Sequence, residues 1–386
     1  MAFLHALHAL ALLCSHSLHA SAGTSVGKMT AAGLAAPEQY SKARVSLFEV
    51  QVPTPGPGEV LVRTESSSVN HLDLLWKVLA PASVWDAAVS FWSVSGGFPK
   101  VLGMDVAGTV VAVGLGVNRL KVGDEVWAFN AGAAVYDGKT LGGLAGHAWA
   151  PYVVLRETGV GIKPKSISFT EAGSLPLVAQ TSLQALKLCG APWDRQSSVL
   201  ILGATGGAGH VAVQLAKALG ATHVIATASA SHTEFVHQLG ADRFIDYHTE
   251  DWWDDSVIPD GSLDAIYDTV LQPMTGDRAF AKLKDHGRYV SLCNGIPSCV
   301  APMPSVISRL KRPSLSATGL RCTPGSCASV KHLDELSELI DAGKLRGHVN
   351  ATMPLTSIQR AIDLVASGTV VGKVAVTISS EDAFVV

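Results

Sequence analysis

The sequence predicts an α/β protein that combines a domain built on a doubly wound parallel sheet with a second, β-rich domain. Three observations carry this prediction. Between residues 198 and 292, strand-like segments alternate with helix-like ones, which is the pattern of a parallel sheet. A glycine-rich turn follows the first of these strands and opens a helix. Before residue 165, short strand-like runs are separated by glycine and proline, as in a β-rich domain.

Length and composition support two folded domains and exclude several classes of protein. The chain has 386 residues, of which 48% are hydrophobic and 16% are charged, and this composition excludes a disordered chain. The formal net charge is -3 and no long basic run occurs, so nucleic acid is not expected as a partner. No stretch reaches the roughly 18 apolar residues of a spanning helix, so no membrane span is expected.

Residues 1–28 differ from the rest and are expected to form a leader or a disordered extension. Ala20-Ser21-Ala22 has the small-x-small form of a signal-peptidase site, but the charged region that precedes such sites is missing. A mitochondrial transit peptide should be rich in arginine, and the first arginine is Arg44. Two alternatives stay open, a removable targeting segment and a functional start at Met29. The location is expected to be intracellular, with the mitochondrion or another organelle as the destination of a targeting segment.

The β-rich domain is assigned to residues 29–165 and 320–386. Two of its extended segments, between Val45 and Thr64, flank a turn rich in proline and glycine. The further strands and helices expected in this domain are strands at Val106–Asn118, Val126–Ala128, Tyr152–Leu155 and Lys373–Ile378, and helices at Lys331–Ala342 and Ser357–Ala366.

The parallel-sheet domain is assigned to residues 166–319, and a helix-length apolar stretch at Leu175–Leu188 leads into its first strand. Gly220, Gly240 and Gly287 are expected to end its helices, because glycine accepts the left-handed conformation without a Cβ clash. The expected elements, in order, are strand Ser198–Leu202, helix Val211–Leu219, strand His223–Thr227, helix Thr233–Leu239, strands Phe244–Asp246 and Leu263–Tyr267, helix Arg278–Lys284 and strand Arg288–Leu292.

The strongest chemical signal is the run Leu200–Gly209, which reads LILGATGGAG. Its small residues let the backbone approach a pyrophosphate, and the amides at the start of the following helix offer donors to that charge. Ala204 replaces the first glycine of the usual G-x-G-x-x-G motif. The strand before the turn and the helix after it still favour a Rossmann dinucleotide site over a merely structural turn.

The end of the second strand favours NADP(H) over NAD(H). An NAD site places Asp or Glu about 20 residues past the turn, where it binds the ribose 2′-hydroxyl. This chain has hydroxyl and alanine side chains there, in Thr227–Ser231, and hydroxyls can donate to a 2′-phosphate that a carboxylate would repel. The usual Arg or Lys partner is missing, and His232 is the only nearby candidate cation. Ser231 is expected to cap the next helix, and Ser229 to serve the cofactor.

The order of these motifs resembles the medium-chain dehydrogenase/reductase superfamily. The sequences LGMDVAG at 102–108 and GDEV at 123–126 precede the glycine turn, and the resemblance runs from about Val45 to Ile378. It implies a GroES-like fold for the β-rich domain and a homodimer. Within the superfamily, Ser68–Asp73 has the Ser-Val-Asn-x-x-Asp form that is usual in quinone oxidoreductases and in enoyl or alkenal reductases.

The resemblance also identifies the positions where zinc alcohol dehydrogenases of the superfamily carry metal ligands. Here those positions are Met104, in place of a histidine, and Asn70, in place of a cysteine. A thioether and a neutral amide are poor zinc ligands, so no metal is expected. Without a Lewis acid, hydride delivery to an electron-poor quinone or enone is favoured, because it needs little beyond positioning.

Several motifs look most like the NADPH-dependent, reticulon-interacting mitochondrial oxidoreductases, among them LGAD at 239–242 and IDAGK at 340–344. This resemblance implies NADPH as cofactor. Tyr247 packing over the sheet edge and Leu292 packing in the core remain alternatives to cofactor contact. The residues implied to bind NADPH are Thr205, Gly206, Gly207, Ala208 and Gly209 in the turn, Ser229 and Tyr247 at the adenosine end, and Thr269 and Leu292 at the ends of later strands.

The function predicted is NADPH-dependent, zinc-independent reduction of a small quinone or an α,β-unsaturated carbonyl. Asn70 is the candidate catalytic residue, as a donor to the substrate oxygen, with a structural turn role as the alternative. Asp73 is expected to be structural, because a carboxylate beside a developing enolate would oppose the reaction. The rivals are a scaffold or sensor protein that binds NADPH without turnover, and a metal-dependent alcohol dehydrogenase. Pro151 and Leu271-Gln272 depart from the family pattern and leave the substrate open.

Overall fold

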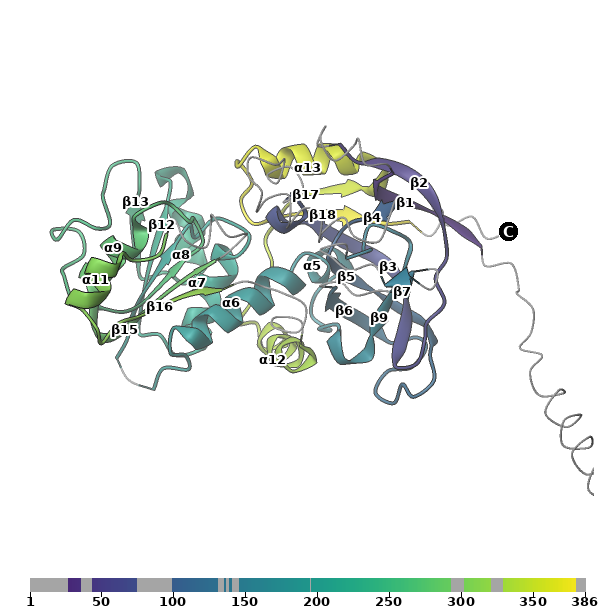
Figure 1. The fold of residues 1–386 in the computed structure, drawn as a ribbon, viewed down its shortest axis with the longest axis horizontal. Coiled ribbons are helices and arrows are strands. Elements are labelled where there is room, and N and C mark those ends of the chain that lie inside the picture. Colours follow the sequence, from purple (N-terminus) through teal and green to yellow (C-terminus); the bar gives the residue numbers. More distant parts are fainter. Residues whose placement is uncertain are drawn as a thin grey trace, which may run out of the picture.

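The computed structural model shows two lobes, a parallel-sheet lobe and a β-rich lobe, with helix α6 (Pro176–Leu188) between them (Figure 1). Both predicted domain types are confirmed. The residues described are 27–35, 44–74, 99–130, 135–136, 139–140, 146–194, 196–292, 302–320 and 329–379.

The first lobe is built on six parallel strands in the order β13-β12-β11-β14-β15-β16. The chain starts at the middle strand, β11, extends the sheet outward on one side, and then returns to extend it on the other. In such a doubly wound sheet, ligands bind at the carboxyl ends of the strands where the order reverses, here between β11 and β14. The strands are β11 (Ser198–Leu202), β12 (His223–Ala228), β13 (Arg243–Asp246), β14 (Leu263–Asp268), β15 (Leu283–Leu292) and β16 (Ser316–Leu320).

Strand β11 is buried on both faces, which explains its unbroken apolar sequence. Val199 and Ile201 pack into one hydrophobic cluster, while Leu200 and Leu202 pack into another, because successive side chains of a strand point to opposite faces. The helices of this lobe are α7 (Gly209–Ala218), α8 (Thr233–Gln238), α9 (Thr275–Lys282) and α11 (Val306–Lys311).

Helix α6 is apolar around most of its circumference, because it is buried along most of its length. Pro176 occupies its first turn, where a missing N–H costs nothing. Helix α12 (Val330–Asp341) packs beside it and buries Leu333, Leu336 and Ile340 in the same core as the parallel sheet.

The β-rich lobe joins segments from both ends of the chain. Strand β18 (Lys373–Thr377) pairs antiparallel with β3 (Glu59–Val69), so that Val374 lies opposite Val69 (Figure 1). The main sheet has the order β10-β6-β5-β3-β18-β17, with β9 also paired to β3. Its other members are β5 (Asp105–Val113), β6 (Glu125–Phe129), β9 (Tyr152–Arg156), β10 (Val160–Ile162) and β17 (Val349–Pro354), with helices α5 (Phe169–Ala172) and α13 (Ile358–Ala366).

Smaller sheets complete this lobe. Strand β1 (Lys28–Leu34) pairs with β2 (Ser46–Gln51) and β4 (Lys100–Val101), and β7 (Val135–Tyr136) pairs with β8 (Lys139–Thr140). The structure thus places Lys28, the last residue assigned to the leader, in a strand. The rest of the predicted leader, up to residue 26, lies outside the described residues.

One predicted helix boundary is wrong. Helix α9 ends at Lys282, and strand β15 begins at the next residue, so Gly287 lies inside a strand instead of ending a helix. Gly220 and Gly240 do follow their helices in the left-handed conformation, with φ of 96° and 100°. In the described part of the chain, no helix is both long and apolar enough for a membrane span.

Candidate active site

The glycine turn joins β11 to α7 through a close approach of backbone to backbone. A Cβ on Gly209 would lie 2.0 Å from the carbonyl oxygen of Gly203, so only glycine fits at the start of this helix. Gly203 has φ of 80° and donates its amide to the Thr227 hydroxyl at 3.0 Å. The amide of Ala204 donates to the Thr227 carbonyl at 2.9 Å. The end of β12 therefore fixes the start of the turn.

The amides of this turn fit an anionic ligand. Gly206 donates its amide to the Gly203 carbonyl at 3.1 Å, but the amides of Thr205, Gly207 and Ala208 have no acceptor among the residues the structure describes. They precede α7, whose N-terminal end carries the positive end of the helix dipole. Free donors and a positive dipole end are what a pyrophosphate needs, so the turn suits a dinucleotide.

Two of the predicted adenosine-side residues lie at adjoining strand ends. Ser229 follows β12, and Tyr247 follows β13 and donates its amide to the Ala228 carbonyl at 3.3 Å. Tyr247 is 54% exposed, and its ring lies 4.3 Å from that of His248. More than half of the tyrosine surface is therefore accessible, and its contact with the cofactor stays a prediction.

The capping role predicted for Ser231 is wrong. A 3-10 turn, η3 (Ala230–His232), precedes α8, so the helix begins at Thr233 and His232 occupies the N-cap position. The inserted turn leaves Ser231 inside η3, where its hydroxyl lies 3.2 Å from that of Ser229. Two hydroxyls thus lie together where the 2′-phosphate was expected.

The two remaining predicted cofactor residues differ in their surroundings. The Thr269 hydroxyl donates to the Leu202 carbonyl at 2.7 Å, so it holds the end of β14 against the glycine turn. Leu292 ends β15 and packs, half-buried, against the main core. Leu292 therefore packs in the core, which was one of its two predicted roles. Its contact with the cofactor stays a prediction.

The loop after β14 adopts an unusual backbone conformation. Leu271 and Met274 have φ of 66° and 67°, in the left-handed region that favours glycine, and each costs roughly 1–2 kcal/mol. The buried Asp268 compensates, because its Oδ1 accepts the amides of Val270 at 2.8 Å and Leu271 at 3.0 Å. Its Oδ2 accepts from the Tyr289 hydroxyl at 2.8 Å. Leu271 thus holds, with strain, a backbone conformation that glycine would adopt freely.

Asn70 is buried just after β3, in a cluster of polar groups. Its amide nitrogen donates to Asp105 Oδ2 at 2.8 Å, and Ser68 donates to the same oxygen at 2.6 Å. Asp105 Oδ1 accepts from the backbone amide of Leu177, in the first turn of α6, at 2.7 Å. Asp105 therefore joins the strand that carries Asn70 to the helix that leads into the other lobe.

Asp73 lies in η1 (His71–Leu74) and closes the turn that begins at Asn70. Its Oδ2 accepts the backbone amide of Asn70 at 2.8 Å. Burial raises the pKa of Asp73 to about 7, and the charge of Asp105 adds to the rise, while the hydrogen bond from Asn70 opposes it. The carboxyl is therefore protonated below about pH 7, which removes the expected conflict with a developing negative charge.

Lys373, the first residue of β18, brings a positive charge into the cluster and was not predicted as a site residue. It is 3% exposed. Its Nζ donates to the Val69 carbonyl at 3.1 Å and to Asn70 Oδ1, and lies 3.7 Å from Asp105 Oδ2. Burial lowers the pKa of Lys373, and the negative charges of Asp105 and Asp73 oppose that shift. The sequence did contain a signal for this residue, because Lys373 is a charged residue at the start of an otherwise apolar strand.

The Asn70 cluster does not fit zinc. Met104 is 1% exposed and belongs to the main hydrophobic core. The amide of Asn70 is engaged by Asp105 and by Lys373, whose charge would repel a cation. Within the described ranges, no three His, Cys, Asp or Glu side chains gather closely enough to hold a metal ion. No step through a metal follows from this arrangement.

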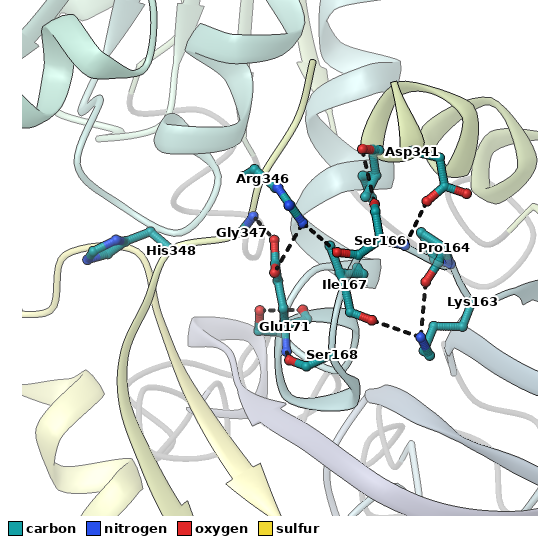
Figure 2. A network of polar contacts seen from close by, with 12 residues as sticks. Lys163, Pro164, Ser166, Ile167, Ser168, Glu171, Asp341, Arg346, Gly347 and His348 are labelled. Atoms are coloured by element: carbon teal, nitrogen blue, oxygen red, sulfur yellow. Dashed lines mark hydrogen bonds and ion pairs between the residues drawn. The ribbon is translucent and has the colours of Figure 1, made fainter. Parts of the chain in front are cut away.

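A polar network ties residues 163–171 to residues 341–348, and we call these two stretches the crossover (Figure 2). The backbone amide of Ser166 donates to Asp341 at 3.0 Å, and its carbonyl accepts from Arg346 at 2.9 Å. The crossover is thus braced by hydrogen bonds as well as by the packing of α6 and α12.

His210 connects the glycine turn to this crossover and was also missed. Its Nε2 accepts the backbone amide of His348 at 3.2 Å, so its Nδ1 carries the proton and donates to the Gly206 carbonyl at 3.1 Å. Burial lowers the pKa of His210 to about 4, so the ring is neutral at pH 7. Figure 2 shows His348 at the far end of the crossover network.

Comparisons with known proteins agree with this architecture. Residues 56–165 match the alcohol dehydrogenase GroES-like domain, and residues 239–376 match the zinc-binding dehydrogenase family. The NAD(P)H oxidoreductase RTN4IP1, mitochondrial, of Mus musculus is 32% identical over 373 residues, which cover 88% of each chain.

A second relative and a solved structure point the same way. The 2-methylene-furan-3-one reductase of Solanum lycopersicum is 35% identical over 248 residues, or 64% of this chain, and the match spans only 58% of that reductase. The quinone oxidoreductase structure from Coxiella burnetii is 27% identical, with a TM-score of 0.71 over 91% of this chain and all of that one. The chain therefore belongs to the medium-chain dehydrogenase/reductase superfamily of nicotinamide-dependent oxidoreductases, alongside its quinone oxidoreductases.

Proposed function

We propose that the protein is an NADPH-dependent oxidoreductase that delivers hydride to a quinone or an α,β-unsaturated carbonyl without a metal. The observation that carries this proposal is the position of Asn70, an amide donor held by Lys373 in a cluster that also contacts the glycine turn. The names of relatives, a furanone reductase and a quinone oxidoreductase among them, support this class of acceptor.

The turn amides would hold the pyrophosphate, and the paired hydroxyls of Ser229 and Ser231 would donate to the 2′-phosphate. Bound NADPH supplies the hydride. An N–H of Asn70 would donate to the acceptor oxygen, and it would stabilise the negative charge that develops there as the hydride arrives. A proton from solvent would then complete the reduction, so that the acceptor would gain one hydride and one proton.

The test is the decrease in NADPH absorbance when purified protein is mixed with a panel of simple quinones and alkenals. We expect turnover of at least one acceptor, and faster turnover with NADPH than with NADH. Tight NADPH binding without turnover of any acceptor would indicate the scaffold or sensor instead, and stoichiometric zinc in the purified protein would contradict the mechanism.

Ser229→Asp tests the choice of cofactor. A carboxylate at this position would repel the 2′-phosphate, so the variant should bind NADPH at least about 10-fold more weakly, a loss of roughly 1.4 kcal/mol. Its affinity for NADH serves as the internal control and should hold or improve. Equal losses for both nucleotides would contradict a 2′-phosphate contact. Fluorescence titration measures both affinities.

The proposal also includes a location in an organelle and assembly as a homodimer. The mitochondrial relative and the unusual first residues support an organelle, which a fusion of residues 1–28 to a fluorescent protein would test. A homodimer is expected from the family, and light scattering of the purified protein would measure it.

A further inference from the structure

We propose that Lys373 is a positioning residue, whose ammonium group orients the amide of Asn70 so that one N–H faces the acceptor oxygen. This inference rests on the proposed function and adds a residue that acts through Asn70. It is carried by three features of the structure, the burial of the ammonium, the fixed direction of the amide and the contact of Lys373 with the glycine turn.

The ammonium of Lys373 is buried, donates two hydrogen bonds and forms an ion pair with Asp105. Lysine is rarely fully buried unless it is paired, and this side chain is 3% exposed. Its three N–H groups face three acceptors, the Val69 carbonyl, the Asn70 amide oxygen and the Asp105 carboxylate. An ammonium with these three partners presents a donor to the Asn70 amide oxygen.

The neighbours of Asn70 allow its amide only one direction. An ammonium has no lone pair, so the side of the amide that faces Lys373 must be the oxygen. A carboxylate has no proton to donate, so the side that faces Asp105 must be the nitrogen, at 2.8 Å. The nitrogen carries two hydrogens, and Asp105 is its only acceptor among the described residues. The second N–H therefore has no acceptor among those residues, and we assign it to the oxygen of the acceptor molecule.

Lys373 also lies beside the glycine turn, so it lies between the two halves of the site. A Cβ added to Gly207 would come within 3.2 Å of Lys373 Cδ. The preceding residue, Gly372, donates its amide to the Thr205 carbonyl at 2.7 Å. Through these contacts, the turn that would bind the cofactor and the amide that would bind the acceptor share one support.

The charges around Lys373 are consistent with a fixed ammonium. Asp105 from β5 and Asp73 from η1 are the acidic groups near it, and His71 and His210 are the titratable groups whose pKa values its charge lowers. With Asp73 protonated, Lys373 and Asp105 form one balanced pair. The cluster then holds no net charge to compete with the charge that develops on the acceptor.

A double-mutant cycle on Lys373 and Asn70 tests the inference. Lys373→Met, Asn70→Ala and the double variant are compared in kcat and KM for the best acceptor. We expect Lys373→Met to lower kcat by roughly 10- to 100-fold, with a smaller change in KM for NADPH, because an oxyanion donor acts in the transition state. The double variant should be no slower than Asn70→Ala, since Lys373 acts through that amide. Lys311→Met, at an exposed lysine of the other lobe, is the matched control.

The inference would be overturned if the fold-loss in kcat of the double variant equalled the product of the two single-variant losses. An unchanged kcat in Lys373→Met would also overturn it. If Lys373→Met fails to fold because Asp105 is left unpaired, Lys373→Met with Asp105→Asn removes both charges. This paired variant should bind NADPH yet show the same loss of kcat, and a wild-type kcat in it would again overturn the inference.

A binding measurement separates this inference from the proposed function. The anion of 2-hydroxy-1,4-naphthoquinone resembles a reduced acceptor, and its affinity for the NADP⁺ complex can be followed by tryptophan fluorescence. Lys373→Met should weaken it at least about 10-fold, and an unchanged affinity would contradict the inference. Wild-type protein that turns over no acceptor would refute the proposed function, whereas active wild-type protein with a fully active Lys373→Met would refute this inference alone.

Discussion

Asp73 carries the largest carboxyl pKa shift near the candidate site, and its position explains why. The side chain is 4% exposed, and its Oδ1 has no hydrogen-bond partner in the part of the chain that the structure describes. Burial without full pairing disfavours the charged form, and Asp105 nearby adds a second negative charge. The carboxyl therefore keeps its proton to about pH 7, which suits the negative charge that we propose to develop on the acceptor.

Asp73→Asn should remove a pH dependence of stability. The carboxyl has a pKa near 3.9 when unfolded and about 7 when folded, so the folded state binds more protons between these values. Its contribution to stability is therefore complete below about pH 4 and is lost as the pH rises towards 7. The free energy of unfolding of wild type relative to Asp73→Asn should fall between pH 5 and pH 8, as urea titrations at both values would show. If the free energy of unfolding of wild type relative to Asp73→Asn were the same at pH 5 and at pH 8, the raised pKa of Asp73 would be contradicted.

At the scale of elements, the unit β11–turn–α7 depends on glycine where the helix packs back on the strand. Because a Cβ on Gly209 would meet the Gly203 carbonyl oxygen at 2.0 Å, the helix and the turn cannot separate without losing their packing. The loop after β14 also has a position that favours glycine, but Leu271 occupies it. The hydrogen bond from the Leu271 amide to Asp268 holds this residue in a left-handed conformation that glycine would adopt freely.

Gly209→Ala should destabilise the protein by roughly 1–3 kcal/mol, the usual cost of overpacking, and weaken NADPH binding. Urea unfolding and fluorescence titration would measure the two effects. Gly159→Ala is the matched control, because a Cβ there has nothing within 4 Å, and it should leave both quantities unchanged or raise stability slightly. A Gly209→Ala protein as stable as this control would contradict the close approach.

At the scale of the whole molecule, the two lobes meet through α6, the crossover segments and two buried polar links. Asp105 accepts from the first turn of α6, and His210 bridges the glycine turn to His348 in the crossover. Both links place candidate site residues at the junction of the lobes.

His210→Gln should alter the acid stability of the folded protein. Histidine has a pKa near 6.5 when unfolded and His210 about 4 when folded, so its contribution is present above about pH 6.5 and is lost as the pH falls towards 4. Glutamine keeps a donor and an acceptor but does not titrate. The free energy of unfolding of wild type relative to His210→Gln should be larger at pH 7 than at pH 5. His147, whose pKa is also lowered to about 4, titrates alike in both proteins and cancels.

Local features were predicted well because their causes lie in neighbouring residues. The order of strands and helices from Ser198 to Leu292 and the C-terminal glycines at Gly220 and Gly240 follow from short-range patterns. The wrong predictions fall where one sequence pattern is compatible with two local structures. A 3-10 turn displaced the predicted cap at Ser231, and glycine in a strand at Gly287 reads like the end of a helix.

The sequence by itself determined that a glycine turn joins a strand to a helix and that Asn70 and Met104 offer no strong zinc ligand, because both depend on residue types at fixed local spacing. Only the tertiary structure decided what surrounds Asn70. Lys373 lies 303 residues away along the chain and reaches Asn70 because β18 pairs with β3. A buried charge acquires its partners from strand pairing between distant segments, and no local pattern encodes that pairing.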